Sequence, residues 1–443
     1  MLALTFTLSL VSQATAHLFP IVFPVKEETP QELAALAWAH YVPRRRPSTR
    51  EGPLGIRRIE LDPDWFVSDL RSVGDFDGDG QGDVLVNLVR RMICGSDIHA
   101  GAAFVLSGTS LEPIALVQRG GHLSLDPGRG AGPNDPWLIL EKSNRTSSTL
   151  TVRPSLSAEP TWSRNEFETP LGQIAEARWV GDLDGDGIED VLASNAWAYG
   201  REGKMDFGLR YANMTGSAIA LSGATGELLW QVFGRRVGEG FGMDLRAARD
   251  LDADGVDDVL ILVASADGAK NSSNRLEWLS GRTGETLDEV GLGELDPYEL
   301  KAVGDFDGDG RSEVWFDMPG FLQEPTRIGR VDREASSPLR IKPDLGRLAA
   351  TLGGDLDGDG ADDLIALIRN QGEASAQLVL RTLAGDRQLL SVTGIAESSS
   401  VQVCAVPSWD PRRPHVILAE SSGFSARDNA NRIGLIPAWA LSY

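Results

Sequence analysis

The chain has 443 residues, of which 42% are hydrophobic, and carries a formal net charge of −22. This length exceeds one ordinary domain and fits two to three domains or an array of repeats, with enough apolar residues for a sizeable core. The strong negative charge argues against a nucleic-acid partner, which requires a basic surface. The 49 glycines and many short apolar runs indicate strands joined by turns rather than long helices.

The first predicted segment, residues 1–16, is an export signal peptide. Residues 2–16 are mostly apolar, uncharged, and end in Ala14-Thr15-Ala16, which matches the small-residue pattern of a cleavage site. The apolar stretch is too short to span a bilayer, and no later stretch is apolar enough to do so. We therefore expect an exported protein (secreted, periplasmic or at the cell surface) without a transmembrane segment. A buried N-terminal strand is the alternative.

Residues 17–59 are predicted to form a helix followed by a basic linker. Thr29 is a candidate N-cap, Pro30 suits the first helical position, and Glu32 completes a capping box ahead of an apolar helix of about three turns. Residues 43–50 combine prolines with arginines. We interpret them as a solvated linker, with docking to an acidic partner as the alternative.

Five copies of an acidic loop, Asp-x-Asp-x-Asp-Gly-x-x-(Asp/Glu), dominate residues 60–443. They begin at residues 75, 182, 250, 305 and 355, at intervals of 107, 68, 55 and 50 residues. The first interval is about twice the others, which predicts a repeat without a loop near residues 120–160. About 80 residues follow the last loop and hold a second repeat without ligands, which ends in a predicted strand over residues 432–441.

Two recurring patterns give each repeat its strands. Short apolar runs flank each acidic loop and form a hairpin, and a second hairpin is built around a Ser-Gly turn, as in residues 104–108, 219–227 and 276–285. Each repeat therefore supplies about four strands in about 50 to 60 residues, the size of a propeller blade. The predicted fold class is all-β, a β-propeller of four-stranded blades. Seven blades are favoured over six or eight.

The residue types and spacing of the acidic loops suit Ca²⁺. This ion takes six to eight oxygen ligands at flexible geometry, which the acids at positions 1, 3, 5 and 9 and the backbone carbonyl at position 7 can supply. Glycine at position 6 permits the sharp turn. Four carboxylates in so short a loop repel one another unless a cation offsets them. Mg²⁺ fits less well because it demands a stricter octahedron.

The loops therefore predict up to five bound Ca²⁺ ions, one in each of five blades. Position 12, where an EF-hand carries its bidentate Glu, is apolar in every loop, so these are not EF-hands. Positions 1, 3, 5 and 9 are predicted to bind through carboxylates and position 7 through its carbonyl. The predicted ligands are Asp75, Asp77, Asp79, Gln81 and Asp83; Asp182, Asp184, Asp186, Ile188 and Asp190; Asp250, Asp252, Asp254, Val256 and Asp258; Asp305, Asp307, Asp309, Arg311 and Glu313; and Asp355, Asp357, Asp359, Ala361 and Asp363.

These loops, their placement between strands, and the Phe-Gly of Gly240-Phe241-Gly242 resemble the FG-GAP repeats of integrin α-subunit propellers and related repeats of exported bacterial proteins. The resemblance covers residues 60–443. It implies a propeller whose calcium loops lie on one face, with partners on the other face or the rim. The two repeats without loops depart from the family pattern.

The predicted function is a calcium-stabilised binding or adhesion module for a protein or glycan surface ligand. A carbohydrate-binding or polysaccharide-degrading propeller and a structural component of a surface assembly are the alternatives. No familiar catalytic motif occurs, so an enzyme is uncertain and less favoured. Trp197 and Trp230 are candidate sugar-stacking residues, with burial in strands as the alternative. Nothing in the sequence indicates the oligomeric state.

The two cysteines, Cys94 and Cys404, lie in the first and last repeats, which a closed ring would bring together. A disulfide between them would lock the ring. Two buried thiols are the favoured alternative, and the sequence leaves both open.

Overall fold

The structure is a computed structural model. It describes residues 30–39, 41, 57–62, 65–90, 101–119, 122–127, 134–142, 148–156, 158–164, 174, 176–195, 215–236, 238–264, 274–293, 297, 299–306, 313–318, 327–331, 339–342, 349–354, 360–368, 375–381, 388–396, 399–406, 415–422 and 431–436. The predicted signal peptide and the basic linker over residues 43–50 lie outside these residues. None of the helices in the described ranges is long and apolar enough to cross a membrane.

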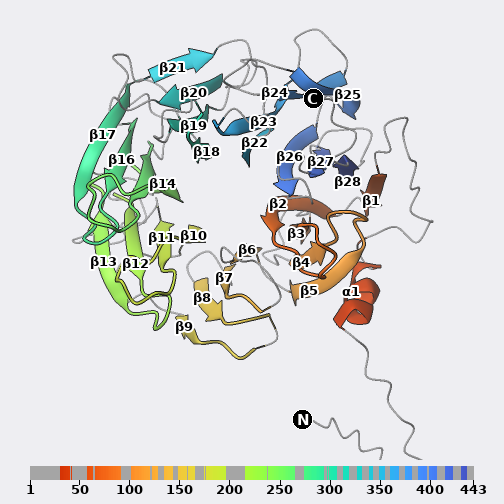
Figure 1. Ribbon diagram of the computed structural model, residues 1–443, viewed down its shortest axis with the longest axis horizontal. Helices are drawn as coiled ribbons and strands as arrows, with labels where there is room; N and C mark the ends of the chain where they lie inside the picture. Colours follow the sequence, from red (N-terminus) through yellow and green to blue (C-terminus); the bar gives the residue numbers. More distant parts are fainter. Residues whose placement is uncertain are drawn as a thin grey trace, which may run out of the picture.

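The described strands form seven four-stranded antiparallel sheets, arranged as a ring around a central opening (Figure 1). In six of these sheets the four strands follow one another in sequence, and the first lies nearest the opening. This arrangement is a β-propeller, so the predicted all-β propeller of four-stranded units is confirmed. The repeat predicted near residues 120–160 corresponds to the sheet formed by strands between His122 and Arg164.

The strands of the seven sheets have the following bounds. Sheet 1 contains β2 (Trp65–Val73), β3 (Asp83–Arg90), β4 (Gly101–Leu106) and β5 (Pro113–Arg119). Sheet 2 contains β6 (His122–Pro127), β7 (Trp137–Lys142), β8 (Ser148–Arg153) and β9 (Trp162–Arg164), and sheet 3 contains β10 (Glu176–Trp179), β11 (Val191–Asn195), β12 (Ser217–Leu221) and β13 (Leu228–Phe233). Sheet 4 contains β14 (Phe241–Ala247), β15 (Val259–Val263), β16 (Asn274–Leu279) and β17 (Thr286–Gly293), and sheet 5 contains β18 (Glu299–Gly304), β19 (Glu313–Met318), β20 (Arg327–Val331) and β21 (Leu339–Lys342). Sheet 6 contains β22 (Ala349–Gly354), β23 (Asp363–Ile368), β24 (Ser375–Arg381) and β25 (Gln388–Ala396), and sheet 7 contains β26 (Ser399–Val406), β27 (His415–Ser422), β28 (Asn431–Ile436) and β1 (Arg57–Leu61).

The middle strands of sheets 3 and 4 are buried along their whole length. Strands β11, β12, β15 and β16 are buried at every residue, because neighbouring sheets cover both of their faces. The outermost strand β17 consists mainly of exposed and partly buried residues, with Leu292 buried. The continuous apolar run of β15 therefore reflects burial between neighbouring sheets, and the polar content of β17 reflects its place at the rim.

Sheet 7 joins the two ends of the described chain. Strand β1 pairs with β28 antiparallel, with Ile59 opposite Ile433. The strand predicted over residues 432–441 corresponds to β28 as far as Ile436, and residues 437–441 lie outside the described residues. Strand β28 is the third strand of its sheet and not the last, since β1 occupies the outer edge. Residues 57–59, placed by the sequence in the linker, thus belong to the propeller.

Helix α1 (Pro30–Trp38) begins at the predicted residue and lies beside β5 at the outside of the ring (Figure 1). The Trp38 and Tyr41 rings pack edge-on against Phe104, with centroids 4.9 and 5.3 Å away. Both residues belong to one buried cluster with Ile59 of β1 and Leu435 of β28. The helix therefore covers the junction at which sheets 1 and 7 meet.

Tryptophans of outer strands connect neighbouring sheets. Trp162 Nε1 of sheet 2 donates to Gly223 O of sheet 3 at 2.8 Å, and Trp230 Nε1 of sheet 3 donates to Gly281 O of sheet 4 at 2.7 Å. Trp230 is 7% exposed, as the burial alternative predicted, and Trp197 lies outside the described residues. The Trp230 indole therefore serves packing between sheets.

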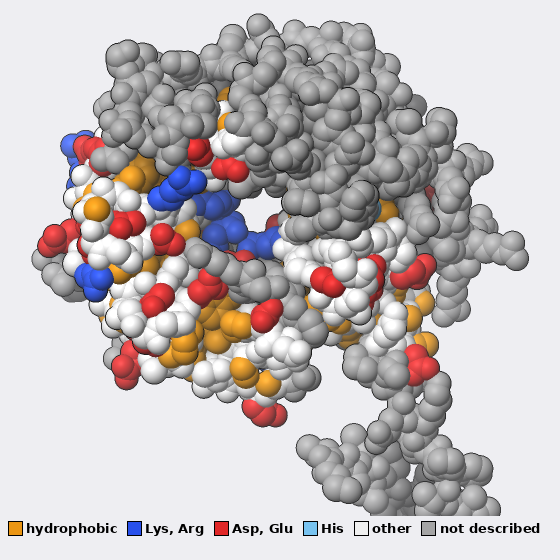
Figure 2. Space-filling model, in the orientation of Figure 1, with side chains coloured by type: hydrophobic (Ala, Val, Ile, Leu, Met, Phe, Trp, Pro, Cys, Tyr) orange, Lys and Arg blue, Asp and Glu red, His pale blue; other side chains and the backbone are white. Residues whose placement is uncertain are grey.

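Charged residues of the inner strands surround the central opening, and Figure 2 shows Lys and Arg side chains lining it. Arg71 of sheet 1 pairs with Asp126 of sheet 2 at 3.0 Å. Arg246 of sheet 4 pairs with Glu176 of sheet 3 at 3.5 Å and donates to Leu300 O of sheet 5 at 2.7 Å. Trp179 N of sheet 3 donates to Asp126 at 2.9 Å. Together these contacts link five consecutive sheets.

Cys404 is a free, buried thiol in β26. Burial raises the pKa of its thiol to about 12, so it stays protonated at neutral pH. Cys94, its candidate disulfide partner, lies outside the described residues.

Candidate metal centres

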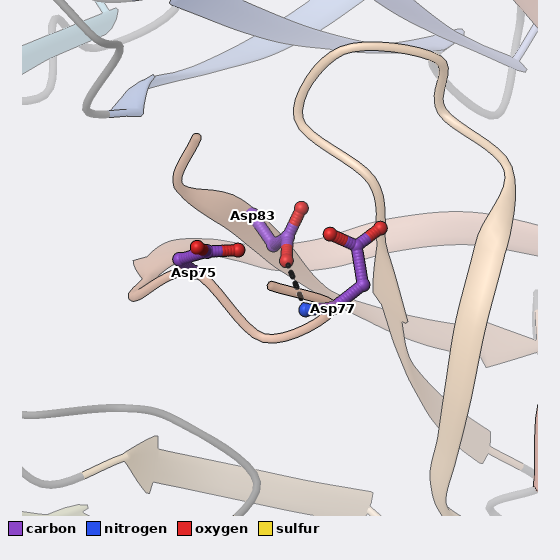
Figure 3. A group of neighbouring side chains, drawn as sticks. All are labelled: Asp75, Asp77 and Asp83. Atoms are coloured by element: carbon purple, nitrogen blue, oxygen red, sulfur yellow. Dashed lines mark hydrogen bonds between the residues drawn. The ribbon is translucent and has the colours of Figure 1, made fainter. Parts of the chain in front are cut away.

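The first acidic loop, residues 75–83, connects β2 to β3. Oxygen atoms of Asp75, Asp77 and Asp83 all lie within 4.8 Å of one another (Figure 3). The backbone winds around Asp75, whose two carboxylate oxygens accept the N–H groups of Gly78 and Gly80, each at 2.8 Å. Both glycines have positive φ, +80° and +82°, which glycine adopts without a steric penalty.

The second loop, residues 182–190, repeats this geometry between β10 and β11. Oxygens of Asp182, Asp184 and Asp190 lie within 4.8 Å of one another. The two carboxylate oxygens of Asp182 accept the N–H groups of Gly185 and Gly187 at 2.7 and 2.8 Å. The same residues at the same positions therefore produce the same local structure in two sheets.

The third loop, residues 250–258, gathers a different set of oxygens. Here Asp250, Asp252 and Asp254 lie within 4.8 Å of one another, so position 5 takes the place that position 9 has in the first two loops. Position 4 is Ala253 instead of glycine, and it has a positive φ of 60°. A side chain in this conformation is strained, which distinguishes this loop from the others.

The fourth and fifth loops are described only at their ends. Asp307, Asp309 and Arg311 of one loop, and Asp355, Asp357 and Asp359 of the other, lie outside the described residues. Phe306 N donates to Glu313 Oε2 at 2.8 Å, so the Glu at position 9 makes the bond that Asp makes elsewhere. Asp305 N donates to Asp362 Oδ2 at 2.9 Å, which joins the two loops directly.

The acid at position 9 connects each fully described loop to the Ser-Gly turn of the same sheet. Asp83, Asp190 and Asp258 are at most 1% exposed. One oxygen of each accepts the N–H of position 2, at 2.8, 2.7 and 2.6 Å respectively. The other accepts the glycine N–H of the turn, at 3.0, 2.8 and 3.0 Å. Sequence reasoning assigned this acid to the ion alone and missed its role in joining two hairpins.

The glycine of the Ser-Gly turn is required by this contact. A Cβ added at Gly108, Gly223 or Gly281 would lie 2.0, 1.8 or 2.0 Å from the backbone carbonyl oxygen of position 8 of the loop. No side chain fits at such distances. The co-occurrence of Ser-Gly with the acidic loops was the sequence signal for this contact, although Ser-Gly by itself predicted only a turn.

The residue at position 2 anchors the loop in the neighbouring sheet. This position is Phe or Leu in all five loops. The Phe76 ring packs edge-on against Trp137 of sheet 2 at 6.2 Å between centroids, and Leu183 shares a buried cluster with Val256 of sheet 4. Each of these two loops therefore contacts its own sheet and the next one.

Burial shifts the protonation of the position 9 acids. Burial raises the pKa of Asp83 and of Asp190 to about 6, although hydrogen bonds from backbone N–H groups stabilise the ionised form and act to lower the pKa. Burial also raises the pKa of Asp258. In contrast, the Arg282 guanidinium holds the pKa of Asp254 below its usual range. The buried carboxylates therefore favour a bound proton or a bound cation.

In calcium-free buffer we expect the chain to be more stable at pH 5 than at pH 7.5. Folded Asp83 and Asp190 keep their protons up to about pH 6, whereas the unfolded chain loses them near 3.8. The folded state therefore binds more protons between these values, and the free energy of unfolding falls as pH rises through them. Urea midpoints at pH 5, 6 and 7.5 measure this trend. The Asp83→Asn/Asp190→Asn variant should show a weaker pH dependence; an equal dependence in both proteins would contradict the assignment.

The donor sets of the first three loops fit Ca²⁺. They offer oxygen atoms only, from several carboxylates held by short turns, which is what a hard cation of variable coordination number accepts. Asp75, Asp77, Asp79 and Asp83 and the carbonyl of Gln81 would hold the ion in the first loop, and the equivalent residues would do so in the second. The closing acids fit as well, since they are buried with raised pKa and a cation would offset their charge.

Comparison with known proteins adds little. No protein-family model matches the chain, and neither does any curated protein. Among solved structures, Kuenenia stuttgartiensis hydrazine synthase is similar at 10% identity and a TM-score of 0.48, covering 83% of this chain and 94% of that chain. Quinohemoprotein alcohol dehydrogenase from Comamonas testosteroni is similar at 9% identity and a TM-score of 0.41, covering 84% and 76% respectively. Similarities at this level indicate nothing about the activity of this chain.

Proposed function

We propose that this chain is an exported, calcium-stabilised, seven-bladed β-propeller that acts as a binding module for a protein or glycan surface ligand. The observation that carries the calcium assignment is the convergence of carboxylate oxygens within 4.8 Å in three separate loops. In two of them the group includes a buried acid that also ties the loop to a second hairpin. Calcium would thus stabilise the hairpins, and binding would occur elsewhere on the propeller.

The topology supports a division between two faces. In sheets 1, 3 and 4, the loop between the first and second strands and the turn between the third and fourth strands lie at the same end, because they touch through the position 9 acid. The connections between second and third strands and between sheets leave from the opposite end. We propose that ligands bind at this opposite end, as the resemblance to integrin α-subunit propellers implies.

Calcium titration of the full chain tests the metal sites. We expect saturable binding of more than one ion, with dissociation constants of about 10⁻⁴ to 10⁻³ M, as in extracellular calcium modules. Isothermal titration calorimetry measures both the number of bound ions and their dissociation constants. The control is the Asp75→Asn/Asp182→Asn variant, which should lose two sites. A wild-type isotherm without calcium heat would refute the metal assignment, whatever the ligand of the propeller proves to be.

A glycan array, read with and without EGTA, separates the ligand classes. Calcium-dependent binding of one glycan class would make the sugar the ligand and favour the carbohydrate alternative. Trp230 is not the residue to explain such binding, because it is buried and bonded to Gly281. Absence of glycan binding from a folded, calcium-loaded chain would favour a protein ligand.

A further inference from the structure

In the third loop, unlike the first two, the aspartate at ligand position 5 is paired with an arginine. Arg282 Nε donates to Asp254 Oδ2 at 2.8 Å, and Nη2 lies 3.5 Å from the backbone oxygen of the same residue. Arg282 directly follows Gly281 of the Ser-Gly turn, so the turn that contacts Asp258 also carries the guanidinium to the loop. The equivalent residues of the first two loops are Thr109 and Ala224.

The guanidinium occupies the oxygen that a metal ion would use. At position 5 of each loop, Oδ1 accepts the N–H of position 7, at 2.8 Å in the first two loops and 2.9 Å in the third. Oδ2 is therefore the oxygen left to face a cation. In the first loop it accepts only a weak bond of 3.3 Å from the neutral Thr109 hydroxyl, whereas in the third it is paired with a positive charge.

We propose that Arg282 is a built-in counter-ion of the third loop, which makes this loop the weakest calcium site of the three that are fully described. The inference rests on the proposed calcium binding of these loops. Ca²⁺ that binds through Asp254 Oδ2 must displace the guanidinium, and it meets an additional positive charge beside the site. Sheet 4 thereby keeps its loop in shape when calcium is scarce, while sheets 1 and 3 depend on the ion.

Exchange of residues between the second and third loops tests this inference. Ala224 is half-buried at the position equivalent to Arg282, so each loop can be given the residue of the other. Arg282→Ala should tighten the weakest calcium-binding step about 3- to 10-fold. Loss of the exposed ion pair that competes with calcium accounts for up to about 5-fold, and removal of the positive charge beside the site adds to this gain in affinity. Ala224→Arg should weaken a tight step by a similar factor.

Calorimetric calcium titrations of the full chain measure these changes. The Arg282→Ala/Asp252→Asn variant lacks a ligand of the third loop and should therefore not show the tighter calcium binding of Arg282→Ala. This result would assign the tighter binding to the third loop. Circular dichroism in calcium-free buffer shows whether each variant is folded. If wild type binds calcium and Arg282→Ala gives the same isotherm, the role of Arg282 is refuted and the proposed calcium sites stand. If wild type binds no calcium, the proposed function itself fails.

Discussion

Removal of calcium is expected to lower the melting temperature of the full chain by roughly 5 to 10 °C. At about 1 mM calcium, a site with a dissociation constant of about 10⁻⁴ M adds about 1.4 kcal/mol to the free energy of unfolding. Five independent sites would add about 7 kcal/mol, which is comparable with the stability of a whole domain. For a chain of this size that unfolds as one unit, each kcal/mol moves the melting temperature by only about 1 °C or somewhat more.

Differential scanning calorimetry in 1 mM calcium, in EGTA, and in EGTA followed by excess calcium measures this effect. The third sample should return to the melting temperature of the first. Magnesium at the same concentration is the control and should restore less, because the loops do not offer the strict octahedron that it needs. A melting curve that EGTA leaves unmoved would contradict structural calcium.

Replacement of Gly223 by alanine is expected to destabilise the chain by about 3 kcal/mol or more. The new Cβ would lie 1.8 Å from Glu189 O, a contact with backbone that no side-chain rotation relieves. The turn must then move away from the loop, and Asp190 loses the N–H that Gly223 donates at 2.8 Å. A buried carboxylate without this partner costs further stability.

Gly291→Ala is the matched control for this substitution. Gly291 is exposed in β17, and an added Cβ would meet nothing within 4 Å. Its effect should stay within about 0.5 kcal/mol, as for ordinary surface substitutions. Urea unfolding of both variants in 1 mM calcium gives the comparison. Equal midpoints for Gly223→Ala and wild type would show that the turn and the loop do not depend on each other.

Local patterns in the sequence predicted much of the fold. The spacing of the acidic loops and the apolar runs around them predicted four-stranded units, because both signals act over a few residues. The turns of the first two loops could also be predicted, because they depend on Asp and Gly residues within nine positions. Helix α1 was predicted from its first turn, and it begins at Pro30 as expected.

Contacts between distant residues could not be predicted in this way. The bond from Gly108 to Asp83 spans 25 residues, and nothing in either segment alone reveals it. Arg282 is part of the Ser-Gly turn in the sequence, but its side chain contacts Asp254 of the acidic loop. Residues 57–59 were predicted as part of the linker, yet pairing with β28 makes residues 57–61 a strand. In each case a partner far along the chain determines the local structure.

The pairing of β1 with β28 also sets the time at which the ring can close. Among the described strands, β1 emerges first during synthesis and β28 last, and Ile59 and Ile433 are about 370 residues apart. Until β28 is available, β1 lacks this partner, and the apolar side chains of Ile59 and Leu61 have no cover from β28. A stalled or truncated chain therefore presents an open strand edge, which invites chaperone capture or aggregation. Pairing of β28 with β1 is thus the step that closes the ring of described sheets.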